Sequence, residues 1–168
     1  LVAHLDVNSD SMTADSGEDS LASVRHTIIM QQGALNAIES FVRSLYPSTD
    51  KGKLATNAAS VFLPALASVT NLLNNTASAW IRANGSSHEL PSGIADAQCQ
   101  LLSSSALCLS TLITTLKARC LPQLPSIIKP LVESLKSVNT LLEDSDNEAG
   151  ELLQLAILKT LQAIAETL

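Results

Sequence analysis

The chain has 168 residues and a net charge of −6, and 46% of its residues are hydrophobic while only 2% are aromatic. This length is sufficient for one ordinary domain core, and an aliphatic core with few rings is typical of packed helices and argues against a β-sheet protein. No uninterrupted apolar run approaches the roughly 20 residues that span a bilayer, so we expect no membrane partner.

The N-terminal half of the chain predicts an acidic lead-in followed by two helices. Residues 1–19 are rich in Asp and Ser and predict a flexible acidic lead-in or loop. Aliphatic residues then recur with a period near 3.6 over residues 20–46 and 53–76, which predicts a helix in each range. Asn, Gly, Ser and Pro are concentrated in residues 79–93, which predicts a loop there.

The C-terminal half predicts further helices separated by short breaks. The same periodicity covers residues 94–119, 126–142 and 148–168. A Leu-Pro-Gln-Leu-Pro turn separates the first two ranges, and the acidic residues 143–147 separate the last two. Because no segment shows strand alternation, the expected fold class is all-α, with about five helices in antiparallel pairs over residues 20–168.

An internal similarity relates two of the predicted helices. The ten residues from Ser60 align with the ten residues from Ser126, so that a serine, an apolar pair, a proline (Pro64 and Pro130) and later aliphatic positions coincide. Proline is tolerated in the first turn of a helix, where the N–H groups have no internal partner, and these prolines would kink helices that begin earlier. We interpret the similarity as a structural repeat.

The segment from Leu121 to Val132 resembles the second helix of a HEAT repeat, in which a Leu-Pro turn leads into an aliphatic helix. The resemblance covers residues 20–168 and is clearer over 94–168. It implies an armadillo-like α-α superhelix, a HEAT-type solenoid segment that acts as a scaffold. Because the sequence has no initiator Met and ends inside a helical pattern, we expect it to be excised from a larger protein.

Three shorter stretches, Ser44–Pro47, Thr56–Ser60 and Arg119–Pro122, are similar to the large snoRNA-associated HEAT-repeat subunits of the small-subunit processome. This similarity implies an intracellular, nucleolar protein of ribosome biogenesis that takes part in small-subunit pre-rRNA processing. Its implied partners are the other proteins of a large ribonucleoprotein assembly, with RNA as a further partner.

Motifs of known catalytic or cofactor sites do not occur in the sequence. There is no phosphate-binding Gly-rich loop, nucleophile elbow or zinc-protease motif, and the three histidines are far apart. The three cysteines, Cys99, Cys108 and Cys120, have spacings that match no metal site and predict buried free thiols. We therefore expect no enzyme activity, no cofactor, no metal and no small-molecule substrate.

Four cations flank the third and fourth predicted helices, namely Lys117, Arg119, Lys129 and Lys136. Five of the sixteen acids lie in residues 1–20 and five more in residues 143–151, so the remaining six acids stand against ten Lys and Arg in a mildly basic helical body. The four cations could form a basic strip for RNA phosphates or an acidic partner. Alternatively, they complement a helix C-terminus and solvate an outer face.

Three other residues are candidates for interaction or modification. Ser16 and Ser145 are each followed by acids, a pattern that acidophilic kinases prefer, and are candidate phosphorylation sites. Trp80 falls in the predicted loop, where it would either anchor that loop by packing or contact a partner.

Two functional hypotheses remain open from the sequence. One is the scaffold segment of a solenoid, in which each helix contacts mainly its neighbours. The other is a self-contained helical bundle that binds an apolar ligand or a single protein partner. The two differ in whether the first helix packs against the fourth or fifth.

Overall fold

The computed structural model describes residues 17–45, 56–85, 93–144 and 147–167, and these ranges contain helices and no strand. The elements are α1 (Gly17–Leu45), α2 (Thr56–Gly85), α3 (Ile94–Leu116), the 3₁₀ segment η2 (Lys117–Gln123), α4 (Leu124–Asp144) and α5 (Glu148–Thr167). The expectation of an all-helical chain is confirmed. Most of the acidic lead-in lies outside the described residues, whereas residues 17–19 already belong to α1.

The prediction of a loop over residues 79–93 is wrong for the first half of that range, because α2 continues to Gly85. Ala77 and Trp80 are only 1% and 2% exposed, so the buried face of α2 extends beyond the predicted end at residue 76. The turn-forming pair Asn84-Gly85 ends the helix instead of lying in the middle of a loop. Burial of an apolar face therefore outweighs the local preference for a turn.

The predicted break between the third and fourth helices is also different in the structure. α3 ends at Leu116, and η2 connects it to α4 without an unstructured turn. The junction depends on Lys117, whose φ of 51° lies in the left-handed region that only glycine adopts freely. At the opposite end of α3, Gly93 precedes the helix with a φ of 89°. An ideal Cβ there would lie 3.1 Å from a guanidinium nitrogen of Arg25.

The two related prolines lie inside helices and not in their first turns. Pro64 is inside α2, and Pro130 is inside α4. Each proline lacks the N–H that would bond to the carbonyl four residues earlier, which belongs to Ser60 in α2 and to Ser126 in α4. The sequence leaves open whether the helices begin near the prolines or earlier, and the structure shows that both begin earlier. Each helix therefore lacks one of its regular backbone hydrogen bonds at the proline.

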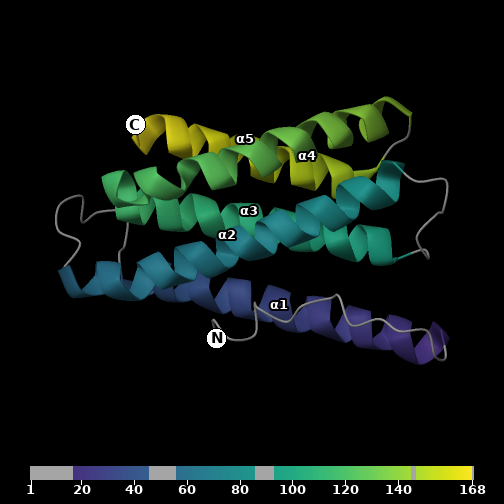
Figure 1. The fold of residues 1–168 in the computed structure, drawn as a ribbon, viewed down its shortest axis with the longest axis horizontal. Helices are drawn as coiled ribbons and strands as arrows, with labels where there is room; N and C mark the ends of the chain where they lie inside the picture. Colours follow the sequence, from purple (N-terminus) through teal and green to yellow (C-terminus); the bar gives the residue numbers. More distant parts are fainter. Residues whose placement is uncertain (1–16, 46–55, 86–92, 145–146, 168) are drawn as a thin grey trace.

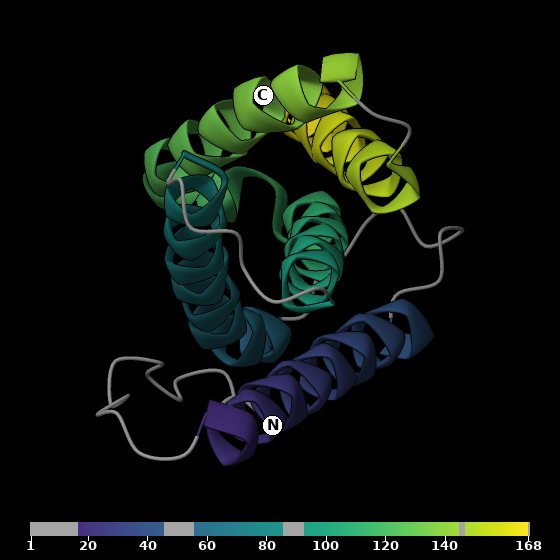
Figure 2. The same ribbon diagram turned by 90° about the vertical axis from the view of Figure 1, so that its right-hand side faces the viewer.

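α3 is the central element of the packing, with the other helices arranged around it (Figure 2). It packs against α1, α2 and α5, while α2 also packs on α4 and α4 packs on α5. Successive helices run in opposite directions along the long axis, so α1, α3 and α5 share one direction and α2 and α4 share the other (Figure 1). The core is aliphatic: its fully buried side chains include Leu66, Leu109, Leu112, Ile127 and Ile157.

Small residues bring α3 and α5 close together. Ala106 and Ala156 are at most 2% exposed, and Thr160 is fully buried. The Thr160 hydroxyl lies 2.8 Å from the carbonyl oxygen of Ala106 in α3 and 2.8 Å from that of Ala156 in its own helix. A buried hydroxyl must find an acceptor, and here the close approach of the two helices provides one.

The helical stretch Ile94–Leu142 is long and apolar enough, by length and composition, to cross a membrane. It contains no long uninterrupted apolar run, because serines and threonines interrupt the aliphatic residues of α3. In the structure 61% of the most apolar part of this stretch is buried. That burial is typical of the central helix of a packed helical domain.

Candidate functional site

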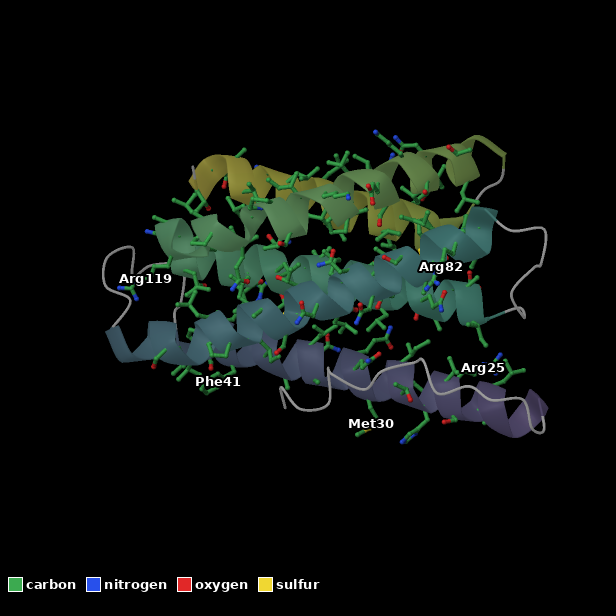
Figure 3. The ribbon with its side chains drawn as sticks, in the orientation of Figure 1. Arg25, Met30, Phe41, Arg82 and Arg119 are labelled. Atoms are coloured by element: carbon green, nitrogen blue, oxygen red, sulfur yellow. The ribbon has the colours of Figure 1, made fainter. Side chains whose placement is uncertain are left out.

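The four cations proposed from the sequence as interaction candidates are exposed, and they lie on two different elements, η2 and α4. Lys117 and Arg119 belong to η2, at one end of the molecule (Figure 3). Lys129 and Lys136 lie on α4, where seven residues correspond to about two helical turns and place both side chains on one face. The structure therefore divides the predicted basic strip into a pair at the end of the molecule and a pair along α4.

The other candidate residues have different outcomes. Trp80 is 2% exposed and belongs to the core within α2, so its side chain is a packing residue of a helix and not part of a loop. A direct partner contact through the Trp80 ring does not fit this position. Ser16 and Ser145 lie outside the described residues.

A groove of about 360 Å³ runs between α2 and α4. Ala77 and Pro130, both buried, and the half-buried Ile81 form its apolar part. The polar and charged side chains that line it are those of Asn74, Ser78, Arg82, Lys129 and Glu133. Lys129 is the only lining residue among the candidates from the sequence, because the α2 side of the groove lies partly in the range predicted as a loop.

One wall of the groove is connected to the other by Asn74. Its Nδ2 donates to the carbonyl of Thr70 at 2.9 Å, within α2, and to the carbonyl of Ser126 at 3.3 Å, on α4. The Ser126 carbonyl is the one that Pro130 leaves without a helical donor. The amide therefore satisfies a backbone group that the proline exposes and joins α2 to α4 beside the groove.

The two cations of the groove have no carboxylate partner among the described residues. The ion pair found among the described residues joins Arg43 to Glu39 at 2.6 Å, and both of these residues belong to α1. Arg82 is positioned by its own helix, since its Nε donates to the carbonyl of Ser78 at 3.1 Å. Two cations and Glu133 leave the groove with one excess positive charge.

Aliphatic side chains are exposed on the outer face of α5. Leu152, Leu155 and Leu158 are 54%, 64% and 48% exposed and recur every third residue, so they form one apolar row. α1 also has exposed apolar residues, including Met30, which projects away from the other helices (Figure 3). Phe41 is also 50% exposed, although one edge of its side chain contacts Phe62 of α2, with the ring centroids 6.1 Å apart. Clustered exposed leucines are unusual on a self-contained domain and are typical of a surface that another protein covers.

The thiols of the chain are buried free cysteines without a metal cluster among the described residues. Burial raises the pKa of the Cys99 thiol to about 11, with a further contribution from Asp96. Burial also raises the pKa of the Cys108 thiol to about 12, with a contribution from Glu39. These thiols remain protonated at neutral pH and do not have the low pKa of a nucleophile.

Comparison with protein-family models, with curated proteins and with solved structures finds no match to this chain.

Proposed function

We propose that this chain is a non-catalytic scaffold segment whose helices stack as a HEAT-type α-α superhelix and bind other proteins of a large assembly. The observation that carries this proposal is the row of exposed leucines on α5, Leu152, Leu155 and Leu158. In a stacked helical array each repeat covers the apolar face of its neighbour, and a terminal helix leaves such a face open. The exposed apolar residues of α1, at the other end of the row of helices, fit the same arrangement.

The helix packing differs from that of a closed bundle, although α1–α2 and α3–α4, which are neighbours in the sequence, show no extensive packing within the described residues. α1 packs on α3 and α3 on α5, while α2 packs on α4, as in two rows of helices laid side by side. Within the described residues no extensive packing joins α1 to α4 or to α5, which is the contact that a closed bundle requires. The alternative function, a self-contained bundle that binds an apolar ligand or a single protein partner, lacks this packing of α1 among the described residues.

We further propose that the assembly is the nucleolar machinery of small-subunit pre-rRNA processing. This part of the proposal is supported by the resemblance of residues 44–47, 56–60 and 119–122 to HEAT-repeat subunits of the small-subunit processome. The exposed cations Lys117 and Arg119 at one end of the molecule would be available to RNA phosphates.

A photo-reactive residue on α5 tests the scaffold proposal. Leu155 is replaced by p-benzoylphenylalanine in cells that express the tagged chain, and Thr140, an exposed residue of α4, is replaced in a matched control. We expect cross-links to a discrete set of proteins from position 155 and few from position 140. Equal cross-linking from both positions would contradict an α5 interface.

Co-purification of RNA tests the ribosomal part of the proposal separately. Early pre-rRNA should be enriched over mature rRNA with the tagged chain, and a Leu152→Glu/Leu155→Glu/Leu158→Glu variant should lose that enrichment. An Asn71→Glu/Asn75→Glu/Thr140→Glu variant, which adds the same negative charge at exposed positions of α2 and α4, should retain it. No enrichment with the unchanged chain would reject the ribosomal role and leave the cross-linking result to decide the scaffold.

A further inference from the structure

We propose that the groove between α2 and α4 binds an acidic peptide segment of a partner protein. In this site a carboxylate of the peptide lies between Arg82 and Lys129, and an adjacent aliphatic side chain packs on Ala77, Ile81 and Pro130. The site is separate from the leucine row on α5, and it does not depend on the ribosomal role.

The shape of the groove suits a peptide side chain. A volume of about 360 Å³ is in the range of sites that hold small ligands or a few peptide side chains. The buried Ala77 and Pro130 provide an apolar floor that is already formed. Because Asn74 joins α2 to the Ser126 carbonyl of α4, the spacing of the two walls is held before any ligand binds, which lowers the entropic cost of binding.

The charges of the groove select an acidic ligand. Arg82 and Lys129 extend from opposite walls, and neither has a carboxylate at ion-pair distance in the part of the chain that the structure describes. The guanidinium of Arg82 keeps its terminal nitrogens available, since the bond to the Ser78 carbonyl uses Nε. A guanidinium and a carboxylate form charge-assisted hydrogen bonds, which are stronger than those between neutral groups.

The remaining lining residues favour a peptide over a nucleic acid. Glu133 would repel the closely spaced phosphates of an RNA strand, whereas a peptide can place a neutral or basic residue beside it. None of the lining residues is aromatic, so the groove offers no ring on which a base could stack. The apolar floor instead matches an aliphatic side chain next to an acid.

Fluorescence anisotropy with a labelled octapeptide of alternating Leu and Glu tests the proposal on the full chain. The variant Arg82→Glu/Lys129→Glu should weaken binding by about tenfold or more, because two attractive charges become repulsive. Glu133→Gln should tighten binding, since it removes the one repulsive charge. The milder variant Arg82→Gln/Lys129→Gln should give an intermediate loss, with circular dichroism showing unchanged helicity.

Arg119→Glu/Lys136→Glu provides the matched control. It makes the same change in net charge at two exposed cations that do not line the groove, and it should leave the affinity within about twofold of the unchanged chain. An equal loss in both double variants would overturn the proposal in favour of non-specific attraction.

Two further measurements can also overturn the proposal. If the unchanged chain does not bind the octapeptide, the groove is not an acidic-peptide site. If a labelled oligouridine binds more tightly than the peptide and loses affinity in Arg82→Glu/Lys129→Glu, the groove is a nucleic-acid site. We expect weak oligouridine binding whose loss in Arg82→Glu/Lys129→Glu is no larger than its loss in Arg119→Glu/Lys136→Glu.

Discussion

Asn74 donates a hydrogen bond to the carbonyl of Ser126, the group on α4 that Pro130 leaves without its helical donor. The proline and the asparagine are therefore complementary, although they lie on different helices. Proline inside a helix ordinarily costs about 3 kcal/mol, in part through the lost hydrogen bond. An external donor recovers some of that cost and at the same time joins α2 to α4.

From this relationship we expect the contribution of Asn74 to the free energy of unfolding to depend on the presence of Pro130. Asn74→Ala should lower the free energy of unfolding by about 1 kcal/mol, because the Ser126 carbonyl loses its donor. In a Pro130→Ala background the same substitution should cost clearly less, since the alanine introduced there supplies a backbone N–H to that carbonyl. Urea denaturation of the four proteins of the cycle measures the difference. Asn75→Ala, at the exposed neighbouring position, is the control, and equal costs in both backgrounds would contradict the pairing.

The hydrogen bond from Thr160 of α5 to α3 is expected to make a second cross-helix contribution to the free energy of unfolding. Thr160→Val keeps the side-chain shape and removes the hydroxyl that reaches the Ala106 carbonyl, so the free energy of unfolding should fall by about 1 kcal/mol. Thr167→Val is the matched control, because the Thr167 hydroxyl bonds only within α5, to Ala163. Thermal unfolding should show a lower Tm for the first variant and little change for the second. Similar shifts in both would argue against the inter-helix bond.

Replacing Gly33 by alanine is expected to stabilise the protein. It lies inside α1, is exposed, and an added Cβ would meet nothing within 4 Å. Gly33→Ala should therefore raise the free energy of unfolding by about 1 kcal/mol, because alanine loses less backbone entropy in a helix. Gly150→Ala provides the contrast, since its Cβ would lie 3.2 Å from Leu142 Cδ2 and the gain in helix propensity would be offset by crowding. Thermal melts of both variants test whether the order of stability is Gly33→Ala above Gly150→Ala.

The backbone conformation of Lys117 indicates that strain is stored at the junction of α3 and η2. Its φ of 51° costs a residue with a side chain about 1–3 kcal/mol, which a glycine does not incur. Lys117→Gly should increase stability by about 1 kcal/mol after the larger unfolded-state entropy of glycine is subtracted. Lys117→Ala removes the charge and keeps the Cβ, so it should give no such gain. A gain of the same size in both variants would assign the effect to the lysine charge instead of the backbone.

The periodicity of aliphatic residues is sufficient to predict the helices, but local turn signals misplace two of their ends. Asn84-Gly85 predicts the middle of a loop, although burial of Trp80 keeps α2 helical up to that pair. The groove is not predictable in the same way. Lys129 is recognisable in the sequence as an exposed cation, but its position opposite Arg82 depends on the packing of α2 against α4, which no local pattern encodes.

The buried thiols predict an alkaline loss of stability. Burial raises the pKa of Cys99 to about 11 and that of Cys108 to about 12, against a value of 9.0 for the unperturbed thiol. Below pH 9 both folded and unfolded chains keep these protons, so the thiols do not change stability with pH. Above pH 9 the unfolded chain releases protons that the folded chain retains, and the free energy of unfolding must fall as pH rises towards 11–12.

Urea denaturation at pH 8 and pH 10 measures this loss in the unchanged chain and in Cys108→Ala. The alanine variant should be less stable at both values, because it loses buried volume, but the difference between pH 8 and pH 10 should be smaller. Every other ionisable group is common to both proteins, so the comparison cancels its contribution to the pH dependence. In the native chain at pH 8, Cys108 should react with a thiol reagent only as fast as the core opens. Rapid labelling of Cys108 without unfolding would place that thiol outside the core.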